Sequence, residues 1–482
     1  QQTTRMYDLI VIGSGPAGEK GAAQAAYFGK SVALIEREPV LGGACVNTGT
    51  VPSKTLRESA LHLSGFSQRG FRGTVEMKIK GDVSIAEFMH RKNLVVEREW
   101  RRIEENLRRH KVERYAGNAR FQSPTRIEVI TASGTTVLEG SIILIATGSS
   151  PFRPASVPFD DDAICDSDTI LHIDSIPRSM AVVGAGVIGC EYASIFAALG
   201  VEVHLVDGRT SLLPHIDREI VRVLLGEMQT RLGVTLHLGC DVETIERVGD
   251  EVNVTLKDSS CFVVEKVLYA AGRSSNTADL NLGAAGVKTG NRGLIIANER
   301  YQTSTENIYA AGDVIGFPAL ASTSMEQARV AMVHAFDLKY KTSVAANLPY
   351  AIYTIPELST IGLTEEQCRE REIRFDVGRA FYRSNARGQI IGDTKGLIKL
   401  VFDSDDFRLL GVHIVGENAS ELLHIGMMVM QFGGTINAFI ESVFNFPTLS
   451  EAYKYAAYDG LGNVARERTN PKARRQPVKE LA

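Results

Sequence analysis

The sequence lacks the features that would point to nucleic acid, a membrane or a metal. Its 53 basic and 57 acidic residues give a net charge of −4, without the basic excess that is typical of nucleic-acid-binding proteins. No uninterrupted apolar run approaches the length of about 18 residues that a transmembrane helix needs. The ten histidines are dispersed and the six cysteines show no CxxC spacing, so we expect no metal site.

Targeting signals are equally sparse. The segment before the first strand has no charged stretch followed by an apolar one, so no secretory signal is expected, and scattered cysteines favour reduced thiols in the cytoplasm. With 44% hydrophobic residues among 482, the chain is not mainly disordered, and its length corresponds to roughly three domains. The basic segment from Arg466 to the end is predicted to be a solvated tail.

The first informative motif opens the chain. The apolar strand YDLIVI precedes the turn GSGPAG, and a helix-like stretch leads to a second strand, SVALIE. Gly13 permits the tight turn, Gly15 lets the backbone approach a pyrophosphate, and Gly18 lets the helix pack closely on the strand. Glu36 ends the second strand, where an acid binds ribose hydroxyls. This order predicts a dinucleotide site.

The same pattern returns 171 positions later, in the turn GAGVIG with Gly184, Gly186 and Gly189. The strand VEVHLVD then ends in Asp207, which favours the free ribose hydroxyls of NAD. Two interpretations remain open for Arg209: it pairs with the 2′-phosphate of NADP, or it is simply solvated. The chain is therefore predicted to bind two dinucleotides.

The remaining segments give coarser expectations. Residues 83–111 predict a long amphipathic helix, and residues 112–145 predict short strands of a small antiparallel insertion. Three prolines between residues 151 and 158 indicate a linker. From about residue 349, strand patterns followed by the Met-rich helix ELLHIGMMVMQF suggest an α+β domain.

The segment GGACVNTGTVPSK, residues 42–54, carries a family resemblance. It resembles the flavoprotein pyridine nucleotide–disulfide oxidoreductases, whose redox segment has two cysteines separated by four residues and then Pro-Ser-Lys. Cys45 matches the first cysteine and Lys54 the lysine, whereas Thr50 stands at the second cysteine. The motifs YAGNARF, ATGSSP, GRSSNT, IYAAGDV and FPTLSEA extend the resemblance over almost the whole chain.

The resemblance implies an α/β fold with two Rossmann-like dinucleotide-binding domains and a C-terminal α+β dimerisation domain. The implied domains are an FAD-binding domain in two parts (1–155 and 276–348), an NAD(P)-binding domain (156–275), and an interface domain (349–482). A homodimer is implied, and larger homo-oligomers are left open. The implied cofactor is FAD, with NAD(H) and NADP(H) as substrates.

The candidate site residues combine the two turns with the family motifs. The candidate catalytic residues are Lys54, Glu191 and Cys45. The candidate cofactor-binding residues are Gly13, Gly15, Gly18, Glu36, Arg37, Gly43, Cys45, Lys54, Gly117, Thr147, Gly148, Gly184, Gly186, Gly189, Asp207, Arg209, Gly272, Arg273, Gly312 and Asp313. By resemblance, Lys54 would lie near flavin N5 and pair with Glu191, and Asp313 would hold the ribityl and phosphate region.

Two departures from the family pattern argue against disulfide reduction. Thr50 cannot form a disulfide with Cys45, and Phe446 stands where the family has its catalytic histidine, which leaves Glu451 without a base to orient. Cys45 is then interpreted either as a small packing residue or as a thiol that tunes the flavin.

Loss of both parts resembles the soluble pyridine nucleotide transhydrogenases of this family. The implied reaction is NADPH + NAD⁺ ⇌ NADP⁺ + NADH, by ping-pong hydride transfer through the flavin. Two alternatives stay open: an NAD(P)H oxidase or quinone reductase, and a flavin-bound sensor or binding protein with little turnover.

Overall fold

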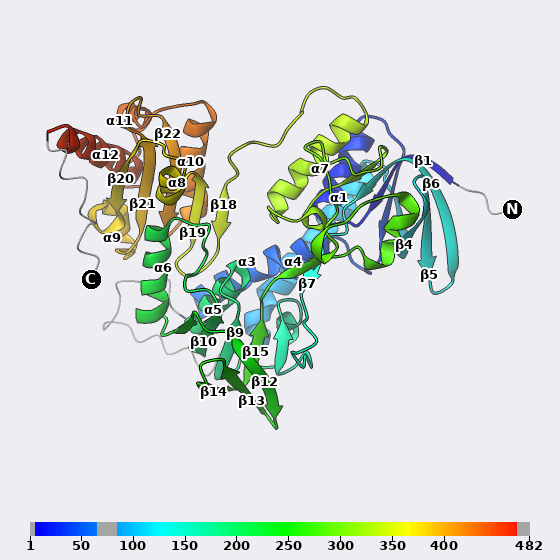
Figure 1. Ribbon diagram of the computed structural model, residues 1–482, viewed down its shortest axis with the longest axis horizontal. Coiled ribbons are helices and arrows are strands. Elements are labelled where there is room, and N and C mark those ends of the chain that lie inside the picture. The colour runs from blue at the N-terminus through cyan, green and yellow to red at the C-terminus, as the bar shows by residue number, and fades with distance from the viewer. Residues whose placement is uncertain (1–4, 65–83, 470–482) are drawn as a thin grey trace. The chain divides into compact units, whose positions relative to one another are not determined.

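The computed structural model describes residues 5–64 and 84–469, which form two compact units (Figure 1). Unit 1 contains residues 5–59, 84–175 and 268–346, and unit 2 contains residues 60–64, 176–267 and 347–469. Most of the predicted basic tail lies outside the described residues. The chain divides into only these two compact units, so the predicted boundaries of the FAD-binding, NAD(P)-binding and interface domains stay predictions.

Unit 1 is built on a sheet whose central strands are parallel. β1 (Arg5–Ile12) lies between β2 (Val32–Glu36) and β6 (Gly134–Ile145), and the sheet continues to β3 (Glu113–Ala116) beyond β2 and to β17 (Ile308–Ala310) beyond β6. The ends of β1 and β6 and most of β2 are buried, as strands covered on both faces must be.

Three long helices pack against this sheet. They are α1 (Pro16–Tyr27), α4 (Ile85–Arg109) and α7 (Ala321–Ala335), and alanines on α1 and α7 let these two helices pack closely side by side (Figure 1). The Ser84 side chain accepts from the Glu87 backbone N–H and Glu87 accepts from the Ser84 N–H, which fixes the start of α4. The helix predicted for residues 83–111 is confirmed.

The prediction of a small antiparallel insertion at residues 112–145 is partly wrong. β4 (Asn118–Ser123) and β5 (Arg126–Thr131) do pair antiparallel with each other, and β5 pairs antiparallel with the first half of β6. However, β3 and the end of β6 join the parallel sheet. The reason is the crossover through α4, which returns the chain beside β2 in the same direction.

The remaining elements of unit 1 are short. They are α2 (Gly43–Asn47), the start of α3 (Thr50–Leu63), β7 (Ser149–Pro151), β8 (Ile164–Asp166), β16 (Arg273–Ser275), and the 3₁₀ turns η1 (Thr169–His172), η2 (Ala278–Leu280), η3 (Leu282–Ala285), η4 (Asn291–Gly293) and η5 (Asp313–Ile315). β7 and β16 pair antiparallel.

Unit 2 contains the second dinucleotide-binding pattern. Parallel strands β9 (Ser179–Val183), β10 (Glu202–Asp207) and β11 (Thr235–Leu238) alternate with helices α5 (Val187–Ala198) and α6 (Arg218–Thr230). A three-stranded antiparallel sheet follows, made of β12 (Val242–Val248), β13 (Glu251–Leu256) and β14 (Cys261–Val264), and β15 (Lys266–Tyr269) leads back to unit 1.

The C-terminal part of unit 2 is a five-stranded sheet covered by helices, which confirms the predicted α+β domain. The sheet order is β18 (Tyr350–Ile352), β19 (Leu358–Gly362), β22 (Leu409–Val415), β21 (Leu397–Asp403) and β20 (Phe375–Phe381). The other elements are α8 (Glu365–Glu370), η6 (Tyr382–Ser384), α9 (Ala386–Ile390), α10 (Ala419–Gln431), α11 (Asn437–Glu441) and α12 (Ala452–Thr469).

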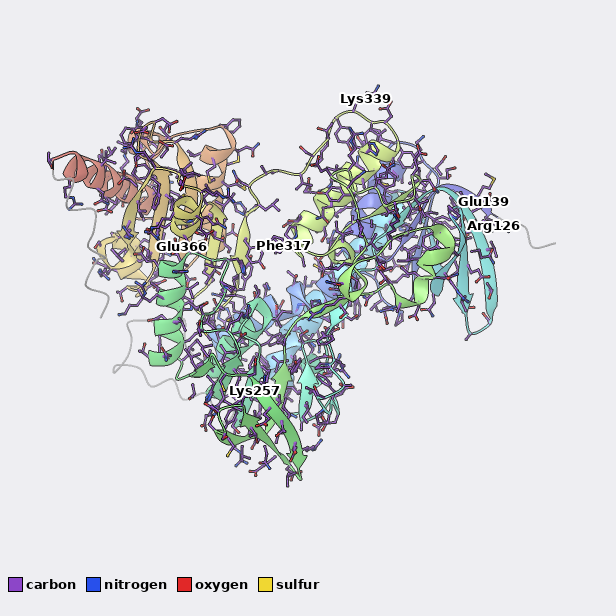
Figure 2. The ribbon with its side chains drawn as sticks, in the orientation of Figure 1. Arg126, Glu139, Lys257, Phe317, Lys339 and Glu366 are labelled. Carbon is purple, nitrogen blue, oxygen red and sulfur yellow. The ribbon has the colours of Figure 1, made fainter. Side chains whose placement is uncertain are left out.

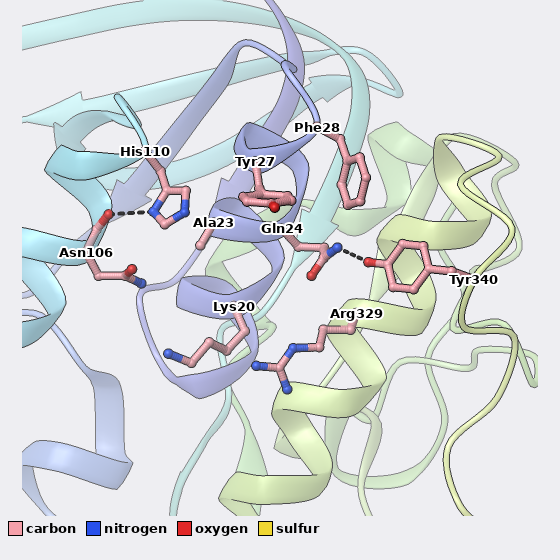
Figure 3. A pocket seen from close by; sticks show the side chains of 9 residues that line it. All are labelled: Lys20, Ala23, Gln24, Tyr27, Phe28, Asn106, His110, Arg329 and Tyr340. Atoms are coloured by element: carbon pink, nitrogen blue, oxygen red, sulfur yellow. Dashed lines mark hydrogen bonds between the residues drawn. The ribbon is translucent and has the colours of Figure 1, made fainter.

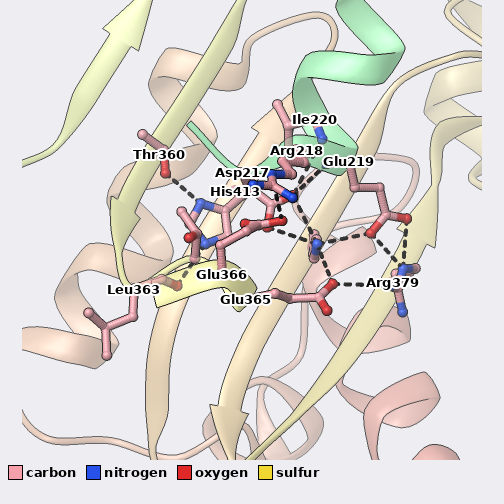
Figure 4. A network of polar contacts seen from close by, with 12 residues as sticks. Asp217, Arg218, Glu219, Ile220, Thr360, Leu363, Glu365, Glu366, Arg379 and His413 are labelled. Carbon is pink, nitrogen blue, oxygen red and sulfur yellow. Dashed lines mark hydrogen bonds and ion pairs between the residues drawn. The ribbon is translucent and has the colours of Figure 1, made fainter. Parts of the chain in front are cut away.

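A buried ionic network joins α6 to this sheet within unit 2 (Figure 4). The Lys399 ammonium on β21 is 1% exposed and lies 2.8 Å from Asp217, 2.9 Å from Glu219 and 2.6 Å from Glu365. Asp217 also caps α6 through the backbone N–H groups of its first turn. Arg379 on β20 donates to Glu219 at 2.8 Å. Each carboxylate therefore has a cation or backbone donor, as buried charges require.

Within residues 5–64 and 84–469, none of the helices combines the length and the apolar character that crossing a membrane requires.

Candidate functional site

The first glycine turn leaves one position open. A side chain at Gly18 would collide with the Gly13 carbonyl, so packing of α1 on β1 requires glycine there. At Gly15, by contrast, the nearest atom to an added Cβ is the Gly43 Cα, 3.9 Å away. Packing within the chain does not explain a glycine at this position, whereas close approach of a phosphate does.

Glu36 is held at the end of β2, beside this turn. Its Oε2 accepts from the Ser14 backbone N–H at 2.9 Å and from the Ser14 hydroxyl at 2.6 Å. Its backbone carbonyl accepts from the Gly117 N–H, which brings the predicted adenine-side loop next to the acid. The turn, the acid and the loop therefore lie together, as a dinucleotide site needs.

The other flavin motifs meet through Ser149. Arg273 donates to the Ser149 hydroxyl at 2.8 Å and to its carbonyl at 2.6 Å, and the Ser149 hydroxyl donates to Asp313 at 2.8 Å. Nearby in the chain, the buried Thr147 hydroxyl has no hydrogen-bond partner among the described residues. A buried hydroxyl without a partner among the described residues fits a bound polar ligand. These residues therefore fit FAD.

Cys45 lies in α2, and its side chain is partly buried. Burial raises the pKa of its thiol, and this effect outweighs the opposing influence of a Thr50 hydrogen bond and of the Lys54 charge. The thiol is free, and Thr50 occupies the place of a partner cysteine. The segment therefore holds neither a disulfide nor a ready thiolate.

In the second glycine turn, as in the first, the third glycine is required by packing and the second is not. A side chain at Gly189 would collide with the Gly184 carbonyl, whereas no atom lies within 4 Å of a Cβ at Gly186. Asp207, at the end of β10, accepts from the Ala185 backbone N–H in this turn at 2.6 Å. The turn of unit 2 is thus also shaped for a phosphate, with an acid beside it.

Arg209 forms a two-point pair with Asp207. Its Nε donates to Oδ1 at 2.8 Å and its Nη2 donates to Oδ2 at 2.7 Å. Burial alone raises the pKa of Asp207, but the hydrogen bonds and charge of Arg209 outweigh it and hold that pKa below its usual range. The Arg209 side chain remains 49% exposed, so a ligand can reach it.

Three further positions from the family resemblance lie in unit 2. Glu191 is 3% exposed and accepts from the Tyr353 backbone N–H at 2.9 Å. Phe446, at the position of the family's histidine, is 72% exposed, and Glu451 lies at the start of the final helix with the Tyr455 hydroxyl 3.5 Å away. Lys54 belongs to unit 1, so its pairing with Glu191 stays a prediction.

The candidate residues therefore fall into two sets. Unit 1 holds Gly13, Gly15, Gly18, Glu36, Arg37, Gly43, Cys45, Lys54, Gly117, Thr147, Gly148, Gly272, Arg273, Gly312 and Asp313. Unit 2 holds Gly184, Gly186, Gly189, Glu191, Asp207 and Arg209. Their roles as ligand contacts stay predictions.

Sequence reasoning missed the residues that hold these groups in place. Ser14 fixes Glu36, Ser149 links Arg273 to Asp313, and Asn276 donates to the Thr147 carbonyl at 3.0 Å. Ser14, Ser149 and Asn276 each lie inside one of the family's motifs, so their locations are visible in the sequence. Their partners are not, because most of these contacts span more than a hundred positions.

Comparisons with known proteins agree with this geometry. The family model "Pyridine nucleotide-disulphide oxidoreductase" matches residues 7–335, and the model of that family's dimerisation domain matches residues 348–457. A protein of Mycobacterium bovis (strain BCG / Pasteur 1173P2) named "Soluble pyridine nucleotide transhydrogenase" is 45% identical over 95% of this chain and 98% of its own length. A protein of the same name from Marinomonas sp. (strain MWYL1) is 38% identical over 96% of this chain and 100% of its own length.

Solved structures give the same result. LpdA from Mycobacterium tuberculosis superposes with a TM-score of 0.86 at 26% identity, covering 94% of this chain and 99% of its own. The "HOCl-induced flavoprotein disulfide reductase RclA" from Escherichia coli gives a TM-score of 0.84 at 28% identity, with the same coverage. Its name describes a disulfide reductase, whereas the present chain has Thr50 opposite Cys45. On these matches and this geometry, the chain belongs to the pyridine nucleotide-disulphide oxidoreductase family.

Proposed function

We propose that this chain is an FAD-dependent pyridine nucleotide transhydrogenase that moves hydride between NADPH and NAD⁺. The Cys45–Thr50 segment carries the proposal, because it keeps the family's position beside Lys54 but holds neither a disulfide nor a thiolate. The names of full-length relatives at 38–45% identity support it. A cytoplasmic homodimer is part of the proposal, supported by the match to a dimerisation domain.

The chain's own residues then have defined tasks. The glycine turn, Glu36 and Asp313 hold FAD, which when bound accepts a hydride from one nicotinamide and gives it to another. Lys54 supplies positive charge near Cys45, and this charge would favour negative charge on a flavin bound there. The glycine turn at Gly186 orients the two nicotinamide nucleotides, which bind one after the other. Hydride transfer of this kind does not need a residue that acts as an acid or a base.

Acceptance of both nucleotides is assigned to Arg209. Its guanidinium pairs with Asp207 when NAD(H) binds, and turns to the 2′-phosphate when NADP(H) binds. The half-exposed position of the side chain supports this exchange.

The test is hydride transfer from NADPH to thio-NAD⁺ by the purified yellow protein under nitrogen. We expect reduction of thio-NAD⁺ in proportion to the NADPH consumed, and a Cys45→Ala variant that keeps its rate within about threefold, because the thiol takes no part.

Two outcomes would contradict the proposal. If NADPH bleaches the flavin while thio-NAD⁺ stays oxidised, a quinone or oxygen is the acceptor instead. If Cys45→Ala loses its activity while retaining flavin, the thiol has a chemical role.

A further inference from the structure

An open groove of about 460 Å³ lies on the helical face of unit 1, between α1, α4 and α7 (Figure 3). α1 and α7 begin near the carboxyl ends of the parallel strands, where the glycine turn lies, and run towards the amino ends. Tyr27, His110 and Tyr340 come at or beyond the C-termini of α1, α4 and α7. The groove therefore extends away from the predicted flavin turn, and none of the candidate site residues lines it.

One wall of the groove is aromatic. The rings of Phe28 and Tyr340 stack with centroids 5.5 Å apart, and Tyr27 meets Phe28 edge-on at 5.3 Å. The Gln24 side chain donates to the Tyr340 hydroxyl and fixes that ring. Tyr27 is 74% exposed, Phe28 41% and Tyr340 53%. A cluster of three solvent-exposed aromatic rings favours binding of a planar ligand that stacks on one of them.

The other wall is cationic. The Arg329 guanidinium from α7 extends towards Lys20 of α1, whose ammonium lies on the Asn106 side of the groove (Figure 3). Lys20 lies 2.9 Å from Glu19, which Arg102 also approaches at 3.5 Å.

Arg329 pairs with Glu326, which Lys341 also contacts at 2.6 Å. Arg102 also pairs with Glu99 at 2.9 Å, so across both clusters four cations face three carboxylates. The wall keeps one excess positive charge, which favours an anion.

We propose that this groove binds a nucleoside monophosphate, with its phosphate between Lys20 and Arg329 and its base against Phe28 and Tyr340. Arginine offers a planar fork that matches phosphate oxygens, and the aromatic pair offers a sequence-tolerant stacking face. The volume falls within the range of about 300–1,000 Å³ that is usual for small-molecule sites. The site is separate from hydride transfer.

The experiment is calorimetric titration of the flavin-loaded protein with AMP, in the presence of saturating NAD⁺ and NADP⁺ so that the nicotinamide site is filled. We expect one AMP per chain, with affinity reduced about tenfold or more in Arg329→Ala and in Tyr340→Ala. Tyr340→Phe keeps the ring, and we expect its affinity to stay within about threefold. Adenosine alone and inorganic phosphate alone should each bind more weakly than AMP.

The matched control is Arg126→Ala, which removes an exposed arginine of the same unit on β5, away from the groove (Figure 2). Flavin content and melting temperature report whether each variant folds. Photolabelling of wild type with 8-azido-AMP provides a test without substitutions, and should modify peptides containing residues 20–28 or 329–340.

The proposal is overturned if AMP does not bind once the nicotinamide site is filled. It is equally overturned if Arg329→Ala and Tyr340→Ala bind AMP like Arg126→Ala, or if the label falls elsewhere. None of these outcomes affects transfer from NADPH to thio-NAD⁺, so failure here is distinguishable from failure of the proposed transhydrogenase activity.

Discussion

At the scale of single residues, Cys45 and Asp207 each have a neighbour that decides what they can do. Thr50 stands where the family has a second cysteine, and burial raises the pKa of the Cys45 thiol. Asp207 faces Arg209, which neutralises the charge that would repel a 2′-phosphate. Both neighbours fit the proposed exchange of hydride between two similar nucleotides, which needs no thiol and must accept both nucleotides.

Replacement of Arg209 by alanine should affect the KM for NADPH and the KM for NADH differently. We expect the KM for NADPH to rise about tenfold, because a charge-assisted two-point contact is lost and Asp207 is left unpaired beside the phosphate. The KM for NADH should change by less than about threefold. Steady-state kinetics with each nucleotide measures this.

Arg178→Ala is the matched control, because the Arg178 side chain is 90% exposed in the same unit and forms an ion pair with Glu265. An unchanged KM for NADPH in Arg209→Ala would exclude the 2′-phosphate contact.

At the scale of elements, the two strand–turn–helix patterns place their glycines for different reasons. The third glycine of each turn serves helix packing, whereas the second faces open space. This difference makes the second glycine a probe of the ligand and the third a probe of the fold.

Alanine at Gly186 and at Gly189 should therefore give opposite results. Gly186→Ala should fold normally and raise the KM of both nicotinamide nucleotides about tenfold or more, because the added methyl group obstructs the pyrophosphate. Gly189→Ala should lower the melting temperature, because the methyl group collides with the Gly184 carbonyl. Kinetics and thermal melts of the two variants check this, and normal nucleotide binding by Gly186→Ala would contradict the assignment.

The elements also show how far sequence patterns carry. The strands around both turns, the capped helix α4 and the Met-rich helix α10 were predictable, because their signals lie within a few residues. The pairing direction of β3 was not predictable, because alternation of apolar residues is the same in parallel and antiparallel strands and α4 decides between them. The contacts of Ser149 with Arg273 and Asp313 were hidden for a related reason, since their partners are more than a hundred positions away.

At the scale of the whole molecule, the Lys399 network is the feature that no local pattern reveals. Asp217, Glu365 and Lys399 come from three separate stretches of sequence and meet only in the folded unit 2. Burial alone lowers the pKa of Lys399, but the surrounding carboxylates outweigh it and raise that pKa. From sequence alone, a lysine is expected at the protein surface and not in the core, so burial of Lys399 was not predictable.

Lys399→Met should destabilise unit 2 by about 3–5 kcal/mol, because it leaves buried carboxylates without their cation. Urea unfolding at neutral pH measures this, with Lys257→Met as control, since Lys257 is 63% exposed in an ion pair worth about 0–1 kcal/mol. Equal effects of the two variants would show that the network contributes nothing beyond a surface pair.

The same network predicts the pH dependence. Burial raises the pKa values of Asp217 and Glu219, but nearby cations and hydrogen-bond donors outweigh it and hold both below 3.8 and 4.5, their usual values. Their stabilisation is therefore present above those usual values and lost as the pH falls through the lower folded-state pKa values. Wild type should lose stability in acid more steeply than Lys399→Met, and parallel curves would contradict this.

The capped start of α6 has a consequence for anyone who would exchange modules between members of this family. Asp217 and Glu219 travel with the nucleotide-binding segment, whereas Lys399, Arg379 and Glu365 travel with the C-terminal sheet. If only the nucleotide-binding segment or only the C-terminal sheet is transferred, buried charges lose their partners. Either Lys399 loses Asp217 and Glu219, or the two acids lose Lys399. Residues 176–267 and 347–469 should therefore be transferred together. A smaller transfer needs compensating substitutions of the charged residues on both sides of the contact between α6 and the C-terminal sheet.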